Sequence, residues 1–572
     1  MKPAFFSYLA ARLRYAFALL LLPLIVLLVV GGCKDDDPDS DAGGSADQPA
    51  AASDEFRAFT NIAPGALGDA AGIMNRYPGV AIFDFDRDGD LDFYVTSAES
   101  GSPIQQARGG ANKLFRNDDG TYVDAAEQAG VAAPEHNSSA VAACDFNNDG
   151  YQDLYVGGMG RVGDDLDYRS IEPGSELELV AGDRLYINRK DGTFADETAS
   201  WLGSQVNVRS VGSLACGDVD NDGWLDLYVG NRSDVDFTVF NDPNHAGHYN
   251  AIYRNAGNST FIDVTRESGL MAPPIVMRDS EGTPITFVDA TTGVETEGFD
   301  PSRLDGAGNV AGDPAGETWA TLFFDHDDDG DIDLWIADDG DRLKVYRNDS
   351  RGTNFRFADI GAPMGIDQSG AWMGFALGDY DGDADLDMFI TNIGFHSITR
   401  GPDNSPSGNC SYAANFQWGT CYHYLLRNDG TVQAPGVGTI GLFPDVAWAT
   451  HVEPSAGAPP ESLNPSKVHP FWRTPTGVAA YDFGFGTAFF DYENDGDQDL
   501  YWLGAIIAPG EGPGGLLYPG FGRMLLNNGD VTFRDVTVES HLIDSSNVDY
   551  TFTGPNQPGF NREEQRIGPE FH

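Results

Sequence analysis

Short apolar runs alternate with polar turns along most of this chain, and the pattern recurs six times. In the first repeat, the apolar stretch GVAIF (79–83) is followed by a nine-residue acidic loop and a second apolar run, FYV (93–95). The stretch LFRNDDGTYVDA (114–125) then places an Asn/Asp/Gly turn between two further apolar segments. Short apolar and aromatic runs bounded by turn residues are typical of β-strands. Each repeat is therefore predicted to form four short strands, with the acidic loop between the first two and the turn between the last two.

The six repeats predict an all-β fold, because a four-stranded unit cannot bury both of its faces alone. Stacking the units in a ring buries these faces and keeps the sheet edges short, which is the β-propeller arrangement. The main alternative is a β-solenoid, whose rungs are shorter than the 54–112 residues that separate these repeats. The segment FRAFTNI (56–62) and the residues after Thr537 suggest a divergent seventh blade built from both ends, with a ring of six as the alternative. The propeller is predicted to span 56–572, with long insertion loops at 271–317, 391–423 and 447–480.

The charge of the chain is strongly one-sided. Its 572 residues include 34 Lys and Arg against 88 Asp and Glu, a formal net charge of −54. A protein this acidic repels nucleic acid, which excludes DNA and RNA as expected partners. Disorder does not explain the acidity, because 41% of the residues are hydrophobic and 12% are aromatic, enough to form a core. The excess charge therefore needs a local explanation.

The six acidic loops supply that explanation, because they place carboxylates at positions 1, 3, 5 and 9 of nine residues. This spacing brings oxygen atoms to one point, while a turn-permitting residue at position 6 lets the chain curl and the carbonyl at position 7 can add a ligand. Without a cation, such a cluster suffers strong like-charge repulsion. Oxygen donors without Cys or His at these positions favour Ca²⁺ over zinc or copper, and the high ligand number favours it over Mg²⁺. We therefore expect about one Ca²⁺ per loop.

The predicted metal-ligand residues fall into six groups, one for each loop. They are Asp84, Asp86, Asp88, Asp90 and Asp92; Asp145, Asn147, Asp149 and Asp153; Asp218, Asp220, Asp222 and Asp226; Asp325, Asp327, Asp329, Asp331 and Asp333; Asp379, Asp381, Asp383, Asp385 and Asp387; and Asp491, Glu493, Asp495, Asp497 and Asp499. Three departures are expected to matter. Asn147 removes a carboxylate and should weaken the second site, and the longer Glu493 should alter the geometry of the sixth. Ala384 stands where the other loops have Gly, which should strain the fifth.

The loop-plus-strand unit resembles the FG-GAP/VCBS-like repeats of integrin-type propellers. The partner motif of the type YRNDG…F.DVT, together with WMGFALGDYDGDADLDMFITN (372–392), resembles the bacterial proteins related to cartilage acidic protein. The resemblance covers roughly 56–537 and implies an extracytoplasmic calcium-binding propeller, without fixing a reaction. Members often carry an ASPIC/UnbV-type C-terminal domain. Because the sequence ends at NREEQRIGPEFH, a complete domain of that type is not expected here.

Residues 1–32 are predicted to be a lipoprotein signal peptide. A positively charged start precedes the apolar run 16–30, which is short for a membrane span. The run ends in VGGC (30–33), which resembles the lipobox of bacterial lipoproteins, so Cys33 is the expected lipidation site. An ordinary secretory peptide and a short anchor helix are the alternatives. Residues 33–55 are small, acidic and rich in Pro, Gly and Ser, and are predicted to form a flexible acidic tether.

These features predict a protein of the bacterial cell envelope, facing the periplasm or the cell surface and touching the membrane only through its N-terminal lipid. The other cysteines fit an oxidising compartment. Cys410 and Cys421 bracket the ten-residue loop SYAANFQWGT and are predicted to form a disulfide. Cys144 and Cys216 lie on apolar strand segments just before two acidic loops and are predicted to be free buried thiols.

Strand order predicts two different faces of the ring. In an antiparallel blade, the acidic loop and the DG turn lie on one face, and the other connections lie on the opposite face. The long insertions fall on that second face, where loops on a rigid scaffold usually carry recognition. Seven histidines lie in these connections: His136, His245, His248, His396, His423, His451 and His469. A transition-metal site made by His245 and His248 with His396 or His423 is one interpretation, and ordinary loop packing is the favoured one.

The sequence therefore predicts an extracytoplasmic, lipid-anchored recognition or adhesion scaffold for a glycan or a protein ligand. The motifs G-x-S-x-G and H-E-x-x-H and a phosphate-binding glycine loop are not found, so enzymatic activity is uncertain and not favoured. The alternative is an enzyme with its site on the insertion-loop face, either a polysaccharide lyase or hydrolase or a metal-dependent oxidoreductase. A structural component of a surface layer is a third possibility.

Overall fold

The computed structural model describes residues 79–98, 110–159, 182–232, 250–270, 286–288, 295–297, 317–367, 369–392, 423–447, 449–453, 478, 483–508, 516–519, 522–537 and 539–540. The chain divides into two units, Met1–Glu55 and Phe56–His572, and every described residue belongs to the second. The predicted signal peptide, tether and lipidation site therefore lie outside the described residues. So do Cys410 and Cys421.

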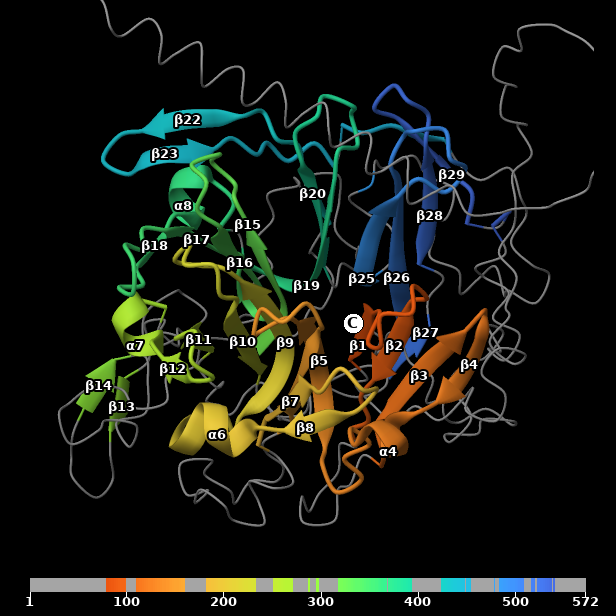
Figure 1. Cartoon of the computed structure of the whole chain (residues 1–572). Helices are drawn as coiled ribbons and strands as arrows, with labels where there is room; N and C mark the ends of the chain where they lie inside the picture. The colour runs from red at the N-terminus through yellow and green to blue at the C-terminus, as the bar shows by residue number, and fades with distance from the viewer. Residues whose placement is uncertain are drawn as a thin grey trace, which may run out of the picture. The chain divides into compact units, whose positions relative to one another are not determined.

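Six four-stranded antiparallel blades form a propeller ring, so the predicted fold is confirmed (Figure 1). The first three blades are β1 (Val80–Phe83), β2 (Asp92–Val95), β3 (Lys113–Asp118) and β4 (Thr121–Asp124); β5 (Ser138–Cys144), β6 (Asp153–Gly158), β7 (Arg184–Asn188) and β8 (Phe194–Asp196); and β9 (Ser210–Gly217), β10 (Asp226–Arg232), β11 (Ala251–Asn255) and β12 (Phe261–Asp263). The fourth is β15 (Glu317–Phe324), β16 (Asp333–Arg342), β17 (Lys344–Asn348) and β18 (Phe357–Asp359).

The fifth blade departs slightly from this plan, whereas the sixth keeps it. The fifth contains β19 (Ser369–Gly378), β20 (Asp387–Asn392) and β21 (Tyr424–Leu426), and its fourth position is a single bridge between Leu426 and Asp445. The sixth contains β25 (Phe483–Phe490), β26 (Asp499–Ala508), β28 (Arg523–Asn527) and β29 (Phe533–Asp535). The end of β16 also pairs with the start of β19, which joins the fourth and fifth blades into one hydrogen-bonded sheet.

Smaller elements decorate the blades. The additional strands are β13 (Thr286–Val288), β14 (Glu295–Glu297), β22 (Thr431–Ala434), β23 (Gly438–Gly441), β24 (Val452–Glu453) and β27 (Leu516–Pro519). The helical segments are α4 (Ala126–Ala129), α6 (Thr198–Leu202), η4 (Gly203–Gln205), α7 (Thr265–Ser268) and α8 (Gly361–Met364). In the part of the chain that the structure describes, no helix has the length and apolar character needed to cross a membrane.

The hydrophobic core lies between neighbouring blades. Phe83 and Leu114 of the first blade pack in one cluster with Leu154 and Tyr186 of the second, and four further clusters join the later blades pairwise in the same way. Alternation along each strand makes this possible, because successive side chains point to opposite faces of the sheet. Each blade thus buries its apolar faces only by stacking on another blade, as the repeat pattern predicted.

The first strands of all six blades surround a central cavity of about 230 Å³. Its lining includes Val80, Ala140, Gly212, Trp319 and Gly374, each from the first strand of a different blade. Gly486 and Thr487 of β25 add the sixth blade. The segments that would build a seventh blade, residues 56–62 and most of the chain after Thr537, lie outside the described residues.

A disulfide joins Cys144 at the end of β5 to Cys216 near the end of β9, with Cα atoms 6.8 Å apart. The prediction that these two cysteines are free buried thiols is therefore wrong. They are 72 residues apart in the sequence but occupy corresponding places on neighbouring blades, just before two acidic loops. Ring stacking, which a single repeat does not reveal, brings the two sulfur atoms together.

Candidate metal centres in the acidic loops

All six acidic loops connect the first strand of a blade to its second. Antiparallel pairing within every blade places these loops on one face of the ring, together with the turns between third and fourth strands. The connections between second and third strands, and those between blades, lie on the other face. The acidic face and the connection face are therefore separate surfaces.

The first residue of each loop holds the chain in a tight curl. In loop 218–226, the backbone N–H groups of Asp222 and Gly223 donate to the two carboxylate oxygens of Asp218, each at 2.9 Å. The same pair of hydrogen bonds is accepted by Asp84, Asp145, Asp325, Asp379 and Asp491. The curl requires a positive φ at positions 4 and 6, here Asn221 (56°) and Gly223 (90°). Asn and Gly tolerate that conformation better than most residues.

The last residue of each loop is an aspartate fixed from two sides. Its Oδ2 atom accepts the N–H of position 2, as in Asp226 with Val219 at 2.9 Å, and its Oδ1 accepts the N–H of an asparagine, here Asn255 at 2.8 Å. Burial raises the pKa of Asp226 to about 8. Burial also raises the pKa of Asp92 to about 6, of Asp153 and Asp387 to about 7, and of Asp499 to about 8. Ionising these groups costs energy that a bound cation would offset.

The third residue of five loops is a carboxylate with at least one buried oxygen that has no hydrogen-bond partner among the described residues. Both oxygens of Asp220 are buried without a hydrogen-bond partner among the described residues. One oxygen is in the same situation in Asp86, Asp327, Asp381 and Glu493. Burial raises the pKa of Asp220 to about 6, and repulsion from Asp222 adds to the increase. A buried acceptor that no donor satisfies is the arrangement expected of a cation ligand.

Four loops bring three carboxylates together, with one oxygen from each lying within 4.8 Å of the others. The sets are Asp84, Asp86 and Asp92; Asp218, Asp220 and Asp226; Asp325, Asp327 and Asp329; and Asp379, Asp381 and Asp387. Positions 1, 3 and 9 form the set in three loops, and positions 1, 3 and 5 form it in the fourth. These donors are all carboxylate oxygens, which are the ligands that Ca²⁺ prefers.

In the other two loops, the described residues do not form such a set of three carboxylates. In the second loop, the Oδ1 atom of Asn147 accepts the N–H of Asp149 at 3.0 Å, so the loop itself uses this amide. In the sixth loop, the longer Glu493 stands at position 3, and burial raises its pKa. These two loops contain the sequence departures from which weaker or altered sites were expected.

The side chains at positions 5 and 7 mostly serve the loop and its neighbours. The Oδ1 atom of Asp88 accepts the N–H of Asp90 at 2.9 Å, and the Oδ2 atom of Asp90 accepts the N–H of Asp119 at 3.0 Å. The Oδ1 atom of Asp331 accepts an N–H of the Asn221 side chain at 2.7 Å. The position-7 carboxylates lie outside the four converging sets: Asp90, Asp331, Asp385 and Asp497.

An asparagine at the end of the third strand fastens the loops of neighbouring blades, a role that the sequence analysis missed. Asn188 donates its backbone N–H to Asp153 and a side-chain N–H to the carbonyl of Phe85 in the preceding blade, both at 2.8 Å. The same cross-blade bond joins Asn255 to Phe146, Asn348 to Val219 and Asn527 to Tyr380. The recurring Asn is visible before each turn, but its partner in the preceding blade lies 103 residues away for Asn188.

The residue at position 4 links one loop to the next. The guanidinium of Arg87 lies 5.2 Å from the ring centre of Tyr151, and the Asn148 side chain donates to the carbonyl of Gly223 at 2.7 Å. Asn221 reaches Asp331 of the fourth loop, as described above. Four consecutive loops are thus in direct contact, so a cation that orders one loop will also support its neighbours.

Two of the three described histidines of the connection face have structural surroundings, and the third, His451, is exposed. Both ring nitrogens of buried His136 are engaged, with Ser138 Oγ at 2.7 Å and the carbonyl of Gly182 at 2.8 Å. The Nδ1 atom of His423 accepts the N–H of Asn392 at 3.0 Å, the role that Asn112 plays toward Ser97 in the first blade. His245, His248, His396 and His469 lie outside the described residues, so a metal site among these loops stays a hypothesis.

Replacing Ala384 by Gly is expected to raise the free energy of unfolding by about 1 kcal/mol, because a Cβ in the left-handed region is strained. Ala384 has a φ of 76°, in line with the strain that the sequence predicted. Urea unfolding in saturating calcium would measure the effect. Ala376→Gly in the extended strand β19 is the control and should lower stability. A variant Ala384→Gly that is no more stable than the native chain would show that the loop relaxes without cost.

The geometry repeated in these loops agrees with the comparison to known families. The FG-GAP-like repeat family matches residues 100–156, 174–229 and 325–390. These spans contain the second to fifth acidic loops, and the six blades supply the ring that such repeats build. The protein is an FG-GAP repeat propeller. The first and sixth loops lie outside the matched spans, yet they repeat the same hydrogen bonds at positions 1 and 9.

Two solved structures share distant similarity with this FG-GAP propeller. A solved structure described as an Agrocybe aegerita lectin that recognises non-reducing terminal N-acetylglucosamine is 13% identical, with a TM-score of 0.34, covering 80% of this chain and 79% of its own. The rhamnogalacturonan lyase YesW is 13% identical, with a TM-score of 0.26, covering 74% of this chain and 69% of its own. No curated protein matches the chain.

Proposed function

We propose that this FG-GAP propeller is a calcium-stiffened recognition scaffold of the bacterial cell envelope, attached by a lipid on Cys33, whose ligand is a glycan or a protein. The observation that carries the proposal is the separation of two surfaces. The acidic loops gather on one face, and the central cavity opens among residues on the connection-face side of the ring. Calcium on the first face would hold the blades in register, leaving the second face for the ligand.

The cavity has the character of a small binding site. Arg232 ends β10 on the connection face, and its guanidinium carbon lies 4.7 Å from the ring centre of Trp319 near the start of β15. Both residues line the cavity, together with Gly212, Gly374 and Gly486. Its volume of 230 Å³ is below the roughly 300–1,000 Å³ of drug-sized pockets. It therefore suits one sugar residue or one inserted side chain, with the aromatic ring and the cation fixing its orientation.

Binding of the calcium-loaded, full-length protein to an immobilised glycan panel tests this proposal. Trp319→Ala is expected to weaken binding by roughly tenfold or more, the effect of losing a central aromatic contact. Trp224→Ala, which removes the same side chain from the acidic face, is the matched control and should leave binding unchanged. Thermal melts in calcium establish that both variants fold. Weakening by Trp224→Ala alone would place the ligand on the acidic face and overturn the assignment of surfaces.

Two further experiments test separate parts of the proposal. Turnover of a retained polysaccharide would make the protein an enzyme rather than a binding scaffold. Loss of metabolic fatty-acid labelling in Cys33→Ser is expected if the lipid is attached at that residue. Equal labelling of the two proteins would refute the anchor without affecting the proposed ligand face.

A further inference from the structure

One acidic loop differs from the other five at position 2. His326 occupies that position in loop 325–333, where the other loops have Phe85, Phe146, Val219, Tyr380 and Tyr492. In the first, second, third and fifth loops this side chain makes an apolar contact with the next blade. Phe85 stacks on Phe194 with ring centres 6.2 Å apart, for example. An imidazole at such a buried place must find polar partners, because leaving it unsatisfied is costly.

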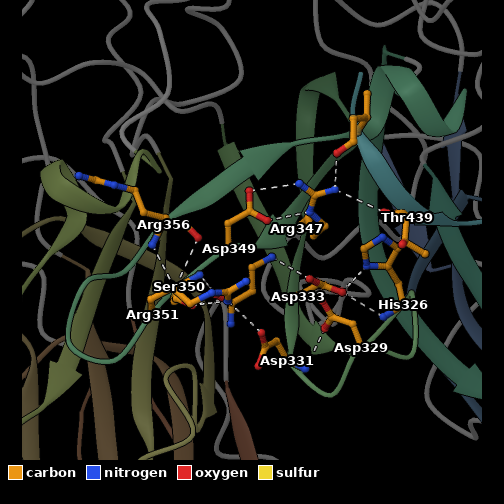
Figure 2. Close-up of polar contacts among 12 residues, drawn as sticks. His326, Asp329, Asp331, Asp333, Arg347, Asp349, Ser350, Arg351, Arg356 and Thr439 are labelled. Carbon is orange, nitrogen blue, oxygen red and sulfur yellow. Dashed lines mark hydrogen bonds and ion pairs between the residues drawn. The ribbon is translucent and has the colours of Figure 1, made fainter. Parts of the chain in front are cut away.

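His326 turns toward the acidic loop, as Figure 2 shows. Its Nδ1 atom contacts the Oδ2 atom of Asp333, and one nitrogen of His326 and one oxygen each of Asp327 and Asp333 lie within 4.8 Å of one another. The three residues are 2%, 4% and 1% exposed, respectively. The Oδ1 atom of Asp327 and the Nε2 atom of His326 are buried without hydrogen-bond partners within the described ranges. Asp327 thus brings unsatisfied acceptor capacity to this cluster.

A hairpin from the fifth blade encloses this loop. The Arg347 side chain pairs with Asp349 of its own blade and donates to the carbonyl of Val437 at 2.8 Å, which fastens the β22–β23 hairpin beside it (Figure 2). Gly441 at the end of β23 stands against the backbone of His326, since an added Cβ would lie 2.4 Å from the His326 carbonyl oxygen. The hairpin thus covers the start of the loop, where His326 and Asp327 are buried, while residues 328–330 stay exposed.

We propose that His326, Asp327 and Asp333 form a binding site for a divalent transition-metal ion of the zinc class. Imidazole nitrogen is a ligand that zinc accepts readily, whereas calcium selects oxygen donors. Two carboxylates and a neutral imidazole balance the charge of one divalent ion, which reduces the desolvation cost of burying that ion. Asp327 also belongs to the set with Asp325 and Asp329, and its two oxygens allow it to serve a calcium ion as well.

Metal inventory of the full-length protein tests the proposal. The chain is saturated with calcium, supplied with one equivalent of Zn²⁺ and passed through gel filtration in excess calcium before mass spectrometry of bound metals. The native chain is expected to retain about one zinc ion. His326→Phe, which introduces the residue of the first two loops, is expected to weaken zinc binding roughly 100-fold while leaving the calcium content unchanged. Tyr380→Phe, at the same position of the fifth loop, is the matched control and should retain zinc.

Cobalt provides a second readout, which is informative in the native chain even without a variant. Co²⁺ bound to the native chain in excess calcium is expected to give the intense visible absorption of four- or five-coordinate cobalt with a nitrogen ligand, and His326→Phe should abolish it. Loss of zinc from the native chain in excess calcium would overturn the proposal, as would equal zinc retention by His326→Phe. If that variant does not fold, the weak spectrum of six-coordinate, all-oxygen cobalt in the native chain would overturn it instead.

Discussion

Removing divalent cations with excess chelator at pH 7.5 is expected to lower the Tm of the full-length protein by roughly 10 °C. A ligand present at 100 times its Kd stabilises a fold by about 2.7 kcal/mol for each site. Four loops with converging carboxylates would together contribute on the order of 10 kcal/mol, which is comparable to the whole stability of a typical domain. Calorimetry with and without chelator measures the effect, and restoring excess calcium should reverse it.

The substitution Asp220→Asn separates calcium binding from other roles of the acidic loops. Neither carboxylate oxygen of Asp220 has a hydrogen-bond partner in the described structure, so the amide loses only charge interactions, of which repulsion from Asp222 outweighs attraction to Arg254. In chelator, the variant should be at least as stable as the native chain, because one repelling charge has been removed. In calcium, it should be less stable by about 1–3 kcal/mol, because a ligand has been weakened. If the native protein has the same melting curve with and without chelator, the calcium assignment is refuted for the whole ring.

The blade could be predicted from the sequence because its determinants are local. Alternation, turn residues and the acidic loop all lie within one repeat, and the expected order of strand, acidic loop, strand, connection, strand, turn and strand is the one found from β1 to β4. The positive φ of Ala384 was also predictable, because the other five loops have a glycine at this position. Each of these features depends on contacts between residues close in the chain.

Features that depend on the stacking of blades could not be predicted in this way. Cys144 and Cys216 pair because corresponding points of two blades face each other, and the local apolar surroundings of each cysteine instead suggested a buried thiol. His326 stands at a position that is aliphatic or aromatic in the other five loops. Its role becomes visible only when its ring is found beside Asp333, under a hairpin of the fifth blade. Local patterns determine the repeat, and interactions between repeats determine the chemistry of individual loops.

The stability of the metal-free protein is expected to fall as the pH rises from about 5 to about 8, and saturating calcium should remove most of this dependence. Burial raises the pKa of the position-9 aspartates well above 3.8, to about 7 for Asp153 and about 8 for Asp226. The folded metal-free chain therefore binds more protons than the unfolded chain in this range, and stability decreases as those protons leave. For Asp153, ionisation in the fold costs about 4 kcal/mol.

A bound cation replaces these protons, so in saturating calcium the folded chain binds almost as few protons as the unfolded chain, and stability should be nearly independent of pH over the same interval. Chemical unfolding at pH 5, 6, 7 and 8, with calcium and with chelator, gives both slopes. The general repulsion of a chain with charge −54 also weakens the metal-free fold at high pH. Asp226→Asn isolates the local contribution, because it removes one buried titration while leaving the other charges in place. A metal-free slope that is unchanged by Asp226→Asn would assign the pH dependence to general repulsion and remove the buried loop aspartates from its explanation.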